Sequence, residues 1–76
     1  MKKYANIHGN SGVSEYSITD SSIKVKFQHG NKLYVYSDAV TGSSHVNTMK
    51  LLAESGRGLS TYIAENKKIL KFTNEF

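Results

Sequence analysis

Apolar and polar residues alternate along three segments in the first half of the chain, a pattern typical of half-buried β-strands. The segments are residues 13–18, 23–27 and 32–37, and the sequence Asp20-Ser21-Ser22 between the first two is typical of a tight turn. Gln28-His29-Gly30 precedes the third segment, and Gly30 can supply the positive φ angle of a three-residue hairpin loop. The pattern therefore predicts a small antiparallel three-stranded sheet.

A three-residue loop also predicts which side chains share a face of this sheet. It sets Val25 opposite Leu33 and Ile23 opposite Val35, so that one face is apolar. A change of one residue in the loop would set Val25 against Tyr34 and mix the two faces, so hydrophobic matching favours the three-residue loop. In this register Phe27 lies opposite Asn31, and the second face carries Lys24, Lys26, Lys32, Tyr34 and Tyr36.

The second half of the chain predicts two short α-helices that follow the sheet and pack on one face of it. Apolar residues between Val46 and Ala53 recur at helical spacing, Ser44 is the expected N-cap, and Gly56 is the expected C-terminal stop. A second helical pattern runs from Leu59 to about Lys68. For the tail after it, including residues 69–72, both a helix and an added strand remain open.

Length and composition indicate one domain, because 76 residues leave no room for a second one. Residues 1–12 contain little apolar surface and are expected to form a loosely ordered arm, with residues 13–76 as the α+β domain. The chain has no cysteine, no long apolar stretch and no apolar run after its basic first residues, so we expect a cytoplasmic protein without a membrane role. A net charge of +4 favours anionic partners, although ordinary solubility also accounts for it.

The sequence favours a protein without catalytic activity, metal or cofactor. His8, His29 and His45 have no metal-ligand spacing, and the six acidic residues are scattered. No nucleophile motif accompanies any serine. We therefore expect a binding protein rather than an enzyme.

Two groups of residues are candidate binding sites, and each also has a purely structural interpretation. The lysines and tyrosines of the second sheet face, Lys24, Lys26, Lys32, Tyr34 and Tyr36, suit RNA or single-stranded DNA, because lysines follow phosphates and tyrosines stack on bases. The same residues are ordinary on a solvent-facing sheet, and the last helix could cover the tyrosines. Gly56, Arg57 and Gly58 could hold a phosphate, but a helix cap alone explains Gly56.

Several short motifs agree with those of one known family. They are Ile23-Lys24-Val25-Lys26-Phe27 before a glycine-containing turn, then Tyr34-Val35-Tyr36, and then the segment from Gly56 to Ile63. From about Gly12 to Lys67 the chain resembles the KTSC family, a short domain that occurs alone in bacteria and phages and at the C-terminus of some lysyl-tRNA synthetases. Residues 39–44 depart from the family pattern, which often has a proline there, and this departure concerns the geometry of the loop. The resemblance implies RNA binding and supplies no catalytic residues.

Two functions are therefore compatible with the sequence. The first is a small binding module that contacts RNA or single-stranded DNA through the basic, aromatic sheet face. The second is a protein-interaction domain, phage- or prophage-encoded, that binds a protein partner or a second copy of itself and has no nucleic-acid role. The small predicted core and the apolar tail residues Ile69, Leu70 and Phe72 favour the second function.

Overall fold

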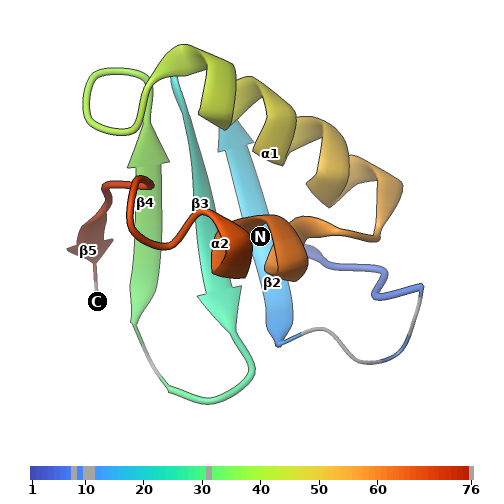
Figure 1. Cartoon of the computed structure of the whole chain (residues 1–76). Coiled ribbons are helices and arrows are strands. Elements are labelled where there is room, and N and C mark those ends of the chain that lie inside the picture. Colours follow the sequence, from blue (N-terminus) through green and yellow to red (C-terminus); the bar gives the residue numbers. More distant parts are fainter. Residues whose placement is uncertain (8, 10–11, 31, 76) are drawn as a thin grey trace.

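The computed structural model describes residues 1–7, 9, 12–30 and 32–75, and over this part of the chain five strands and two helices form an α+β fold. The strands pair antiparallel in the order β1-β2-β3-β4-β5, and both helices lie on one face of the sheet (Figure 1). The α+β class, the antiparallel sheet and the two helices are confirmed. The elements are β1 (Lys2–Lys3), β2 (Val13–Thr19), β3 (Ser22–Phe27), β4 (Leu33–Ser37), α1 (Ser43–Ser55), α2 (Leu59–Glu65) and β5 (Thr73–Glu75).

The prediction of three strands was wrong because two short edge strands extend the sheet within the described residues. At one edge β1 pairs with β2, and at the other β5 pairs with β4, as Figure 1 shows for β5. The tail therefore continues into an added strand at Thr73–Glu75, while residues 69–72 before it are neither helix nor strand. It is held to the domain by Leu70, which is 4% exposed, and by the Thr41 hydroxyl, which donates a hydrogen bond to the Lys71 carbonyl.

The N-terminal segment differs from the loosely ordered arm that its composition predicts. The Tyr4 backbone N–H donates to the Ser14 carbonyl at 2.9 Å, and the Tyr4 ring is 3% exposed and contacts the Tyr16 ring edge-on. Farther along, the Ile7 N–H donates to the Gly56 carbonyl at 2.8 Å. A single buried aromatic residue thus attaches this polar segment to the domain, while residues 8, 10 and 11 of the predicted arm lie outside the described residues.

The register between β3 and β4 corrects the predicted one by one residue. Val25 lies opposite Tyr34 and Ile23 opposite Tyr36, whereas Leu33 and Val35 lie opposite Lys26 and Lys24. Asn31, which was predicted to face Phe27, lies outside the described residues. The physical reason for this register is area: a tyrosine ring buries more apolar surface than valine, so placing the tyrosines under the helices stabilises the fold more.

The core forms between the helical layer and the inner face of the sheet, the face that the helices cover. On β2, Val13 and Tyr16 are both buried although three positions separate them, because the pairing with β3 is irregular between Val13 and Glu15. Such a bulge restores the side-chain parity of the strand. The buried apolar residues are Tyr4, Val13, Tyr16, Ile23, Val25, Tyr36, Val46, Met49, Ala53, Leu59 and Leu70.

The helix ends agree only partly with the sequence signals. Gly56 ends α1 as predicted, with a left-handed φ of 77° and its N–H donating to the Ala53 and Leu52 carbonyls. The N-cap is Gly42 rather than Ser44, so α1 begins two residues earlier than predicted, and its cap makes no side-chain hydrogen bond. The second helix ends at Glu65, before the predicted Lys68, because the Asn66 side-chain amide donates to the Tyr62 carbonyl at 2.8 Å and caps the helix there.

Candidate nucleic-acid interface

An apolar groove of about 420 Å³ opens between the inner face of the sheet, α2 and the C-terminal tail. We call it the aromatic groove. The helix α2 is only seven residues long, so it does not extend over this end of β3 and β4. The residues that line the groove are Phe27, Tyr34, Tyr36, Ser60, Ile63, Ala64, Lys67, Leu70 and Phe72.

The aromatic rings in the groove touch one another, and Phe72 is the most exposed of them. Tyr34 packs edge-on against Phe27, with ring centroids 5.2 Å apart, and lies 4.8 Å from Phe72 in a tilted arrangement. Tyr36 is also in contact with Phe72, at 5.7 Å. Phe72 is 42% exposed, Phe27 and Tyr34 are half-buried and Tyr36 is 2% exposed, so Phe72 presents the largest accessible aromatic surface of the groove.

Two lysines lie close to this aromatic cluster. Lys67 lines the groove itself. Lys32 lines a neighbouring hollow of about 400 Å³ together with His29, and this hollow shares Phe27 and Tyr34 with the groove. The cluster therefore has an exposed lysine in each of its two adjoining cavities.

The predicted site residues are divided between the two faces of the sheet. Tyr34 and Tyr36 point to the inner face, and Lys32 joins them at its rim. Lys24 and Lys26 lie on the opposite, outer face, where Lys26 is 3.9 Å from the Glu15 carboxylate. The basic, aromatic face as drawn from the sequence was wrong, because the register that carried it was wrong.

Sequence reasoning missed Phe27, Lys67 and Phe72 as parts of this site. Phe27 was assigned to a fully covered face, and the groove residues of the tail depend on β5 pairing with β4, which no local pattern shows. The run from Lys67 to Phe72 does carry a signal, because it combines three lysines with three apolar residues.

Burial changes the acid–base behaviour of one tyrosine in the cluster. Loss of solvent around its hydroxyl, with a smaller contribution from the neighbouring Tyr34, raises the pKa of Tyr36 to about 12. The phenol therefore stays neutral up to a higher pH than an ordinary tyrosine does.

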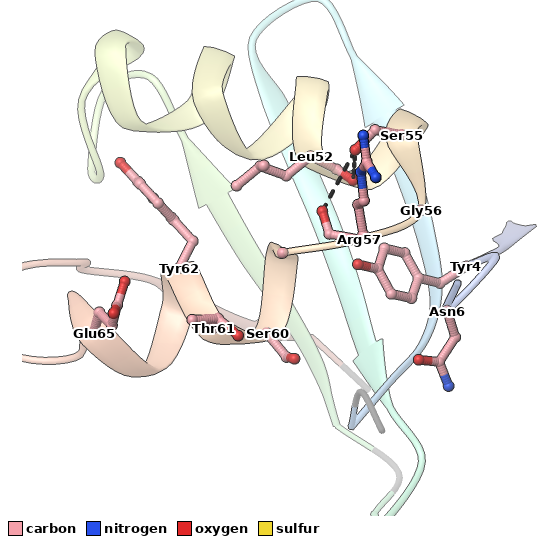
Figure 2. A pocket seen from close by; sticks show the side chains of 11 residues that line it. Tyr4, Asn6, Leu52, Ser55, Gly56, Arg57, Ser60, Thr61, Tyr62 and Glu65 are labelled. Carbon is pink, nitrogen blue, oxygen red and sulfur yellow. Dashed lines mark hydrogen bonds between the residues drawn. The ribbon is translucent and has the colours of Figure 1, made fainter. Parts of the chain in front are cut away.

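A second and larger hollow, of about 660 Å³, lies on another side of α2 and is shown in Figure 2. We call it the Arg57 hollow. The N-terminal segment, the end of α1 and α2 all contribute to it. Its lining residues are Tyr4, Asn6, Leu52, Ser55, Gly56, Arg57, Gly58, Ser60, Thr61, Tyr62 and Glu65.

The structure brings together Gly56, Arg57 and Gly58 at this hollow, where two of the nearby backbone N–H groups already have partners within the protein. The Gly56 N–H is used to cap α1, and the first N–H of α2, that of Leu59, donates to the Tyr4 hydroxyl at 3.3 Å. A cap therefore accounts for Gly56. The exposed Arg57 side chain is the remaining element of this prediction that is suited to an anion.

Two further findings apply to the described residues alone. They contain no cluster of three or more histidine, aspartate and glutamate side chains arranged to hold a metal ion. In the same residues no helix is long and apolar enough to span a membrane. His8, one of the three histidines considered above, lies outside the described residues.

In comparisons with known proteins, the chain matches no family profile, no curated protein and no solved structure. The similarity to the KTSC family stays a prediction.

Proposed function

We propose that the protein binds single-stranded nucleic acid, with RNA as the first candidate, in the aromatic groove. The observation that carries the proposal is the groove itself, where an accessible Phe72 ring lies against Tyr34 and beside Lys67. An unpaired base can stack on such a ring, and base–aromatic stacking contributes about 1 to 3 kcal/mol per base. Bases in a duplex are already stacked, so the strand must be single.

Charge supports the same assignment. The net charge of +4 attracts a polyanion, and Lys67 in the groove and Lys32 in the adjoining hollow add positive charge beside the aromatic rings. Each phosphate contact releases condensed counterions, so affinity must fall as salt rises. The proposal involves binding alone and no chemical step.

The test is a titration of a labelled oligouridylate of about eight nucleotides at low and moderate salt. We expect Phe72→Ala to weaken binding by about 5- to 100-fold, because a stacking platform is lost. The matched control is Ile69→Ala, since Ile69 is an exposed apolar residue of the same tail that does not line the groove. Wild-type affinity for Phe72→Ala, or no binding even at low salt, would contradict the proposal.

Lysine variants distinguish the groove from the outer face of the sheet. Lys67→Gln should lower both the affinity and its salt dependence, whereas Lys26→Gln makes the same change of charge on the opposite face and should have the smaller effect. The reverse order would place the nucleic acid on the outer face.

The second candidate function is binding to a protein partner or to a second copy of the chain through the tail. The tail supports it through Ile69, which is 55% exposed, whereas Leu70 is buried in the domain. Light scattering tests self-association directly. A dimer that Ile69→Ser converts to a monomer would favour this function, and a monomeric wild type would remove the self-association version of it.

A further inference from the structure

The hydroxyl of Tyr36 has no hydrogen-bond partner among the residues that the structure describes, although the side chain is 2% exposed. Other tyrosines of the chain differ in this respect. The Tyr4 hydroxyl accepts the Leu59 N–H, and the Tyr62 hydroxyl lies 2.7 Å from Nδ1 of His45. A hydroxyl that leaves water without gaining a partner destabilises the folded protein, so an enclosed one without a partner points to a ligand.

Among the cavities described above, the aromatic groove is the one that Tyr36 lines. Loss of solvent around the hydroxyl raises the pKa of Tyr36 to about 12, so the polar end of the side chain is enclosed together with its ring. The oxygen still keeps some contact with solvent, because among the described residues the fully enclosed atom without a partner is Asp38 Oδ1. A molecule in the groove can therefore reach the Tyr36 hydroxyl.

The Tyr36 ring is in contact with the ring on which a base is proposed to stack. The centroids of Tyr36 and Phe72 are 5.7 Å apart, and the two ring planes are tilted by 54°. Stacking alone does not select a base, since every base has a π-face. A base that stacks on Phe72 inside the groove can turn a polar edge towards Tyr36, and that edge would supply the missing partner.

The other polar side chains of the groove have water as an alternative partner. Lys67 is exposed, and Tyr34 and Ser60 are half-buried. Water can hydrogen-bond to these three groups whether or not a base is bound, so a base that replaces this water gains less from them. The enclosed Tyr36 hydroxyl is the group for which the edge of the base makes the largest difference.

The chemistry of a neutral phenol indicates which edge fits. Its O–H is a hydrogen-bond donor, and a carbonyl oxygen is a good acceptor for it. Uracil has a carbonyl oxygen on each side of its ring nitrogen N3, whereas adenine has none. A base with carbonyl groups on its edge is therefore the best partner for this hydroxyl.

We infer that Tyr36 selects the base in the aromatic groove by donating its O–H to a carbonyl oxygen on the edge of the base, with uracil as the first candidate. This inference rests on the proposed function. Phe72 and Lys67 would act on any nucleotide, because stacking and charge are common to all of them. Tyr36 adds a preference for a base that can accept a hydrogen bond.

The experiment compares the labelled oligouridylate with the same oligomer carrying difluorotoluene in place of each uracil. Difluorotoluene has the shape of the base and stacks, but it hardly accepts hydrogen bonds. For each protein the measured quantity is the ratio of the two affinities, uracil over difluorotoluene. We expect this ratio to be about 5- to 50-fold lower in Tyr36→Phe than in the wild type, because the variant has no hydroxyl to satisfy.

Tyr62→Phe is the matched control. It removes the same group from a tyrosine whose hydroxyl already lies beside His45 and which does not line the groove. Its affinity ratio should equal that of the wild type. An unchanged ratio in Tyr36→Phe, or an equal decrease in Tyr62→Phe, would overturn the inference and leave binding in the groove intact. Failure of both oligomers to bind the wild type would overturn the proposed function as well.

A thermal melt of the free protein at neutral pH tests the starting observation independently of any nucleic acid. Tyr36→Phe keeps the ring and removes a hydroxyl that has no partner, so it should melt at the wild-type temperature or above it. A clearly lower melting temperature would mean that the hydroxyl is already hydrogen-bonded within the protein, and this result would also overturn the inference.

Discussion

The two faces of the sheet are built from the same strands and differ in what covers them. On the inner face Ile23 and Val25 have no exposed surface, because the helices and the tail enclose them. On the outer face Val35 and Lys24 lie opposite each other and both are half-buried. The comparison teaches that a domain of this size covers one face only, and that an apolar residue on the other face is sheltered by the apolar stems of its lysine neighbours.

The tyrosines and the aliphatic residues of β4 illustrate how this difference sorts side chains. Tyr36 is enclosed, whereas Val35, its neighbour in the strand, lies outside. Polarity alone would predict the reverse. The ring area of tyrosine decides the matter, since burying the ring removes more apolar surface from water than burying a valine side chain does.

The largest effect expected from the comparison is that of a carboxylate placed on each face. Val25→Asp should unfold the domain, because an unpaired buried charge costs several kcal/mol against a total stability of about 5 to 15 kcal/mol. Val35→Asp should remain folded, because its side chain would be half-exposed and opposite Lys24. Thermal melts followed by circular dichroism measure both. If Val35→Asp unfolds and Val25→Asp does not, the register described above is wrong.

An intermediate effect is expected where the N-terminal segment packs against Gly56 at the end of α1. Gly56 and Gly9 have the same φ of 77°, but an added Cβ at Gly56 would lie 2.6 Å from Ala5 whereas at Gly9 it would meet nothing within 4 Å. Gly9→Ala should cost roughly 1 to 2 kcal/mol for the left-handed backbone alone. Gly56→Ala should cost about 3 kcal/mol, because overpacking is added to that term.

Urea unfolding of the two glycine variants gives this difference directly. Equal losses of stability would mean that the segment containing Ala5 does not pack on the end of α1.

The smallest effect concerns the pH dependence of the free energy of unfolding, to which the buried Tyr36 hydroxyl on the inner face contributes. The pKa of Tyr36 is raised from 10.0 to about 12 in the folded protein, so the folded state resists deprotonation more than the unfolded state does. The corresponding stability is complete below pH 10 and is lost as the pH rises from 10 towards 12. The loss should be about 2 to 3 kcal/mol, since each unit of pKa difference corresponds to about 1.4 kcal/mol.

Tyr36→Phe tests this assignment, because phenylalanine keeps the ring and cannot ionise. Between pH 9 and 12 the variant should lose less stability than the wild type, by about 2 to 3 kcal/mol. An unchanged pH dependence would show that another group is responsible.

The sequence predicted those features that local patterns determine. The core strands, the helical face of α1 and the glycine that ends it were all readable, because alternation, helical spacing and the left-handed cap are properties of neighbouring residues. Fold class followed from these elements.

Features that depend on distant contacts were not readable. Hydrophobic matching between β3 and β4 favoured a loop one residue shorter than the observed one, because the correct pairing depends on the helices that later cover one face. Tyr4 and Leu70 join the core from segments without a repeating pattern, and strands of two or three residues leave no periodicity to detect. The candidate site was predicted least well, because the groove depends on both the β3–β4 register and the position of the tail.

The order of the strands in the sheet repeats their order along the chain, and this has a consequence for how the domain folds. From β1 to β4 each strand pairs with its predecessor, so no helix has to be spanned before these pairings form. Only β5 must return across both helices to reach β4. Because the entropy of loop closure rises with the length of chain enclosed, we expect the first four strands to associate early and quickly and the tail to dock last. The aromatic groove, which needs the tail, would then be completed in the final step of folding.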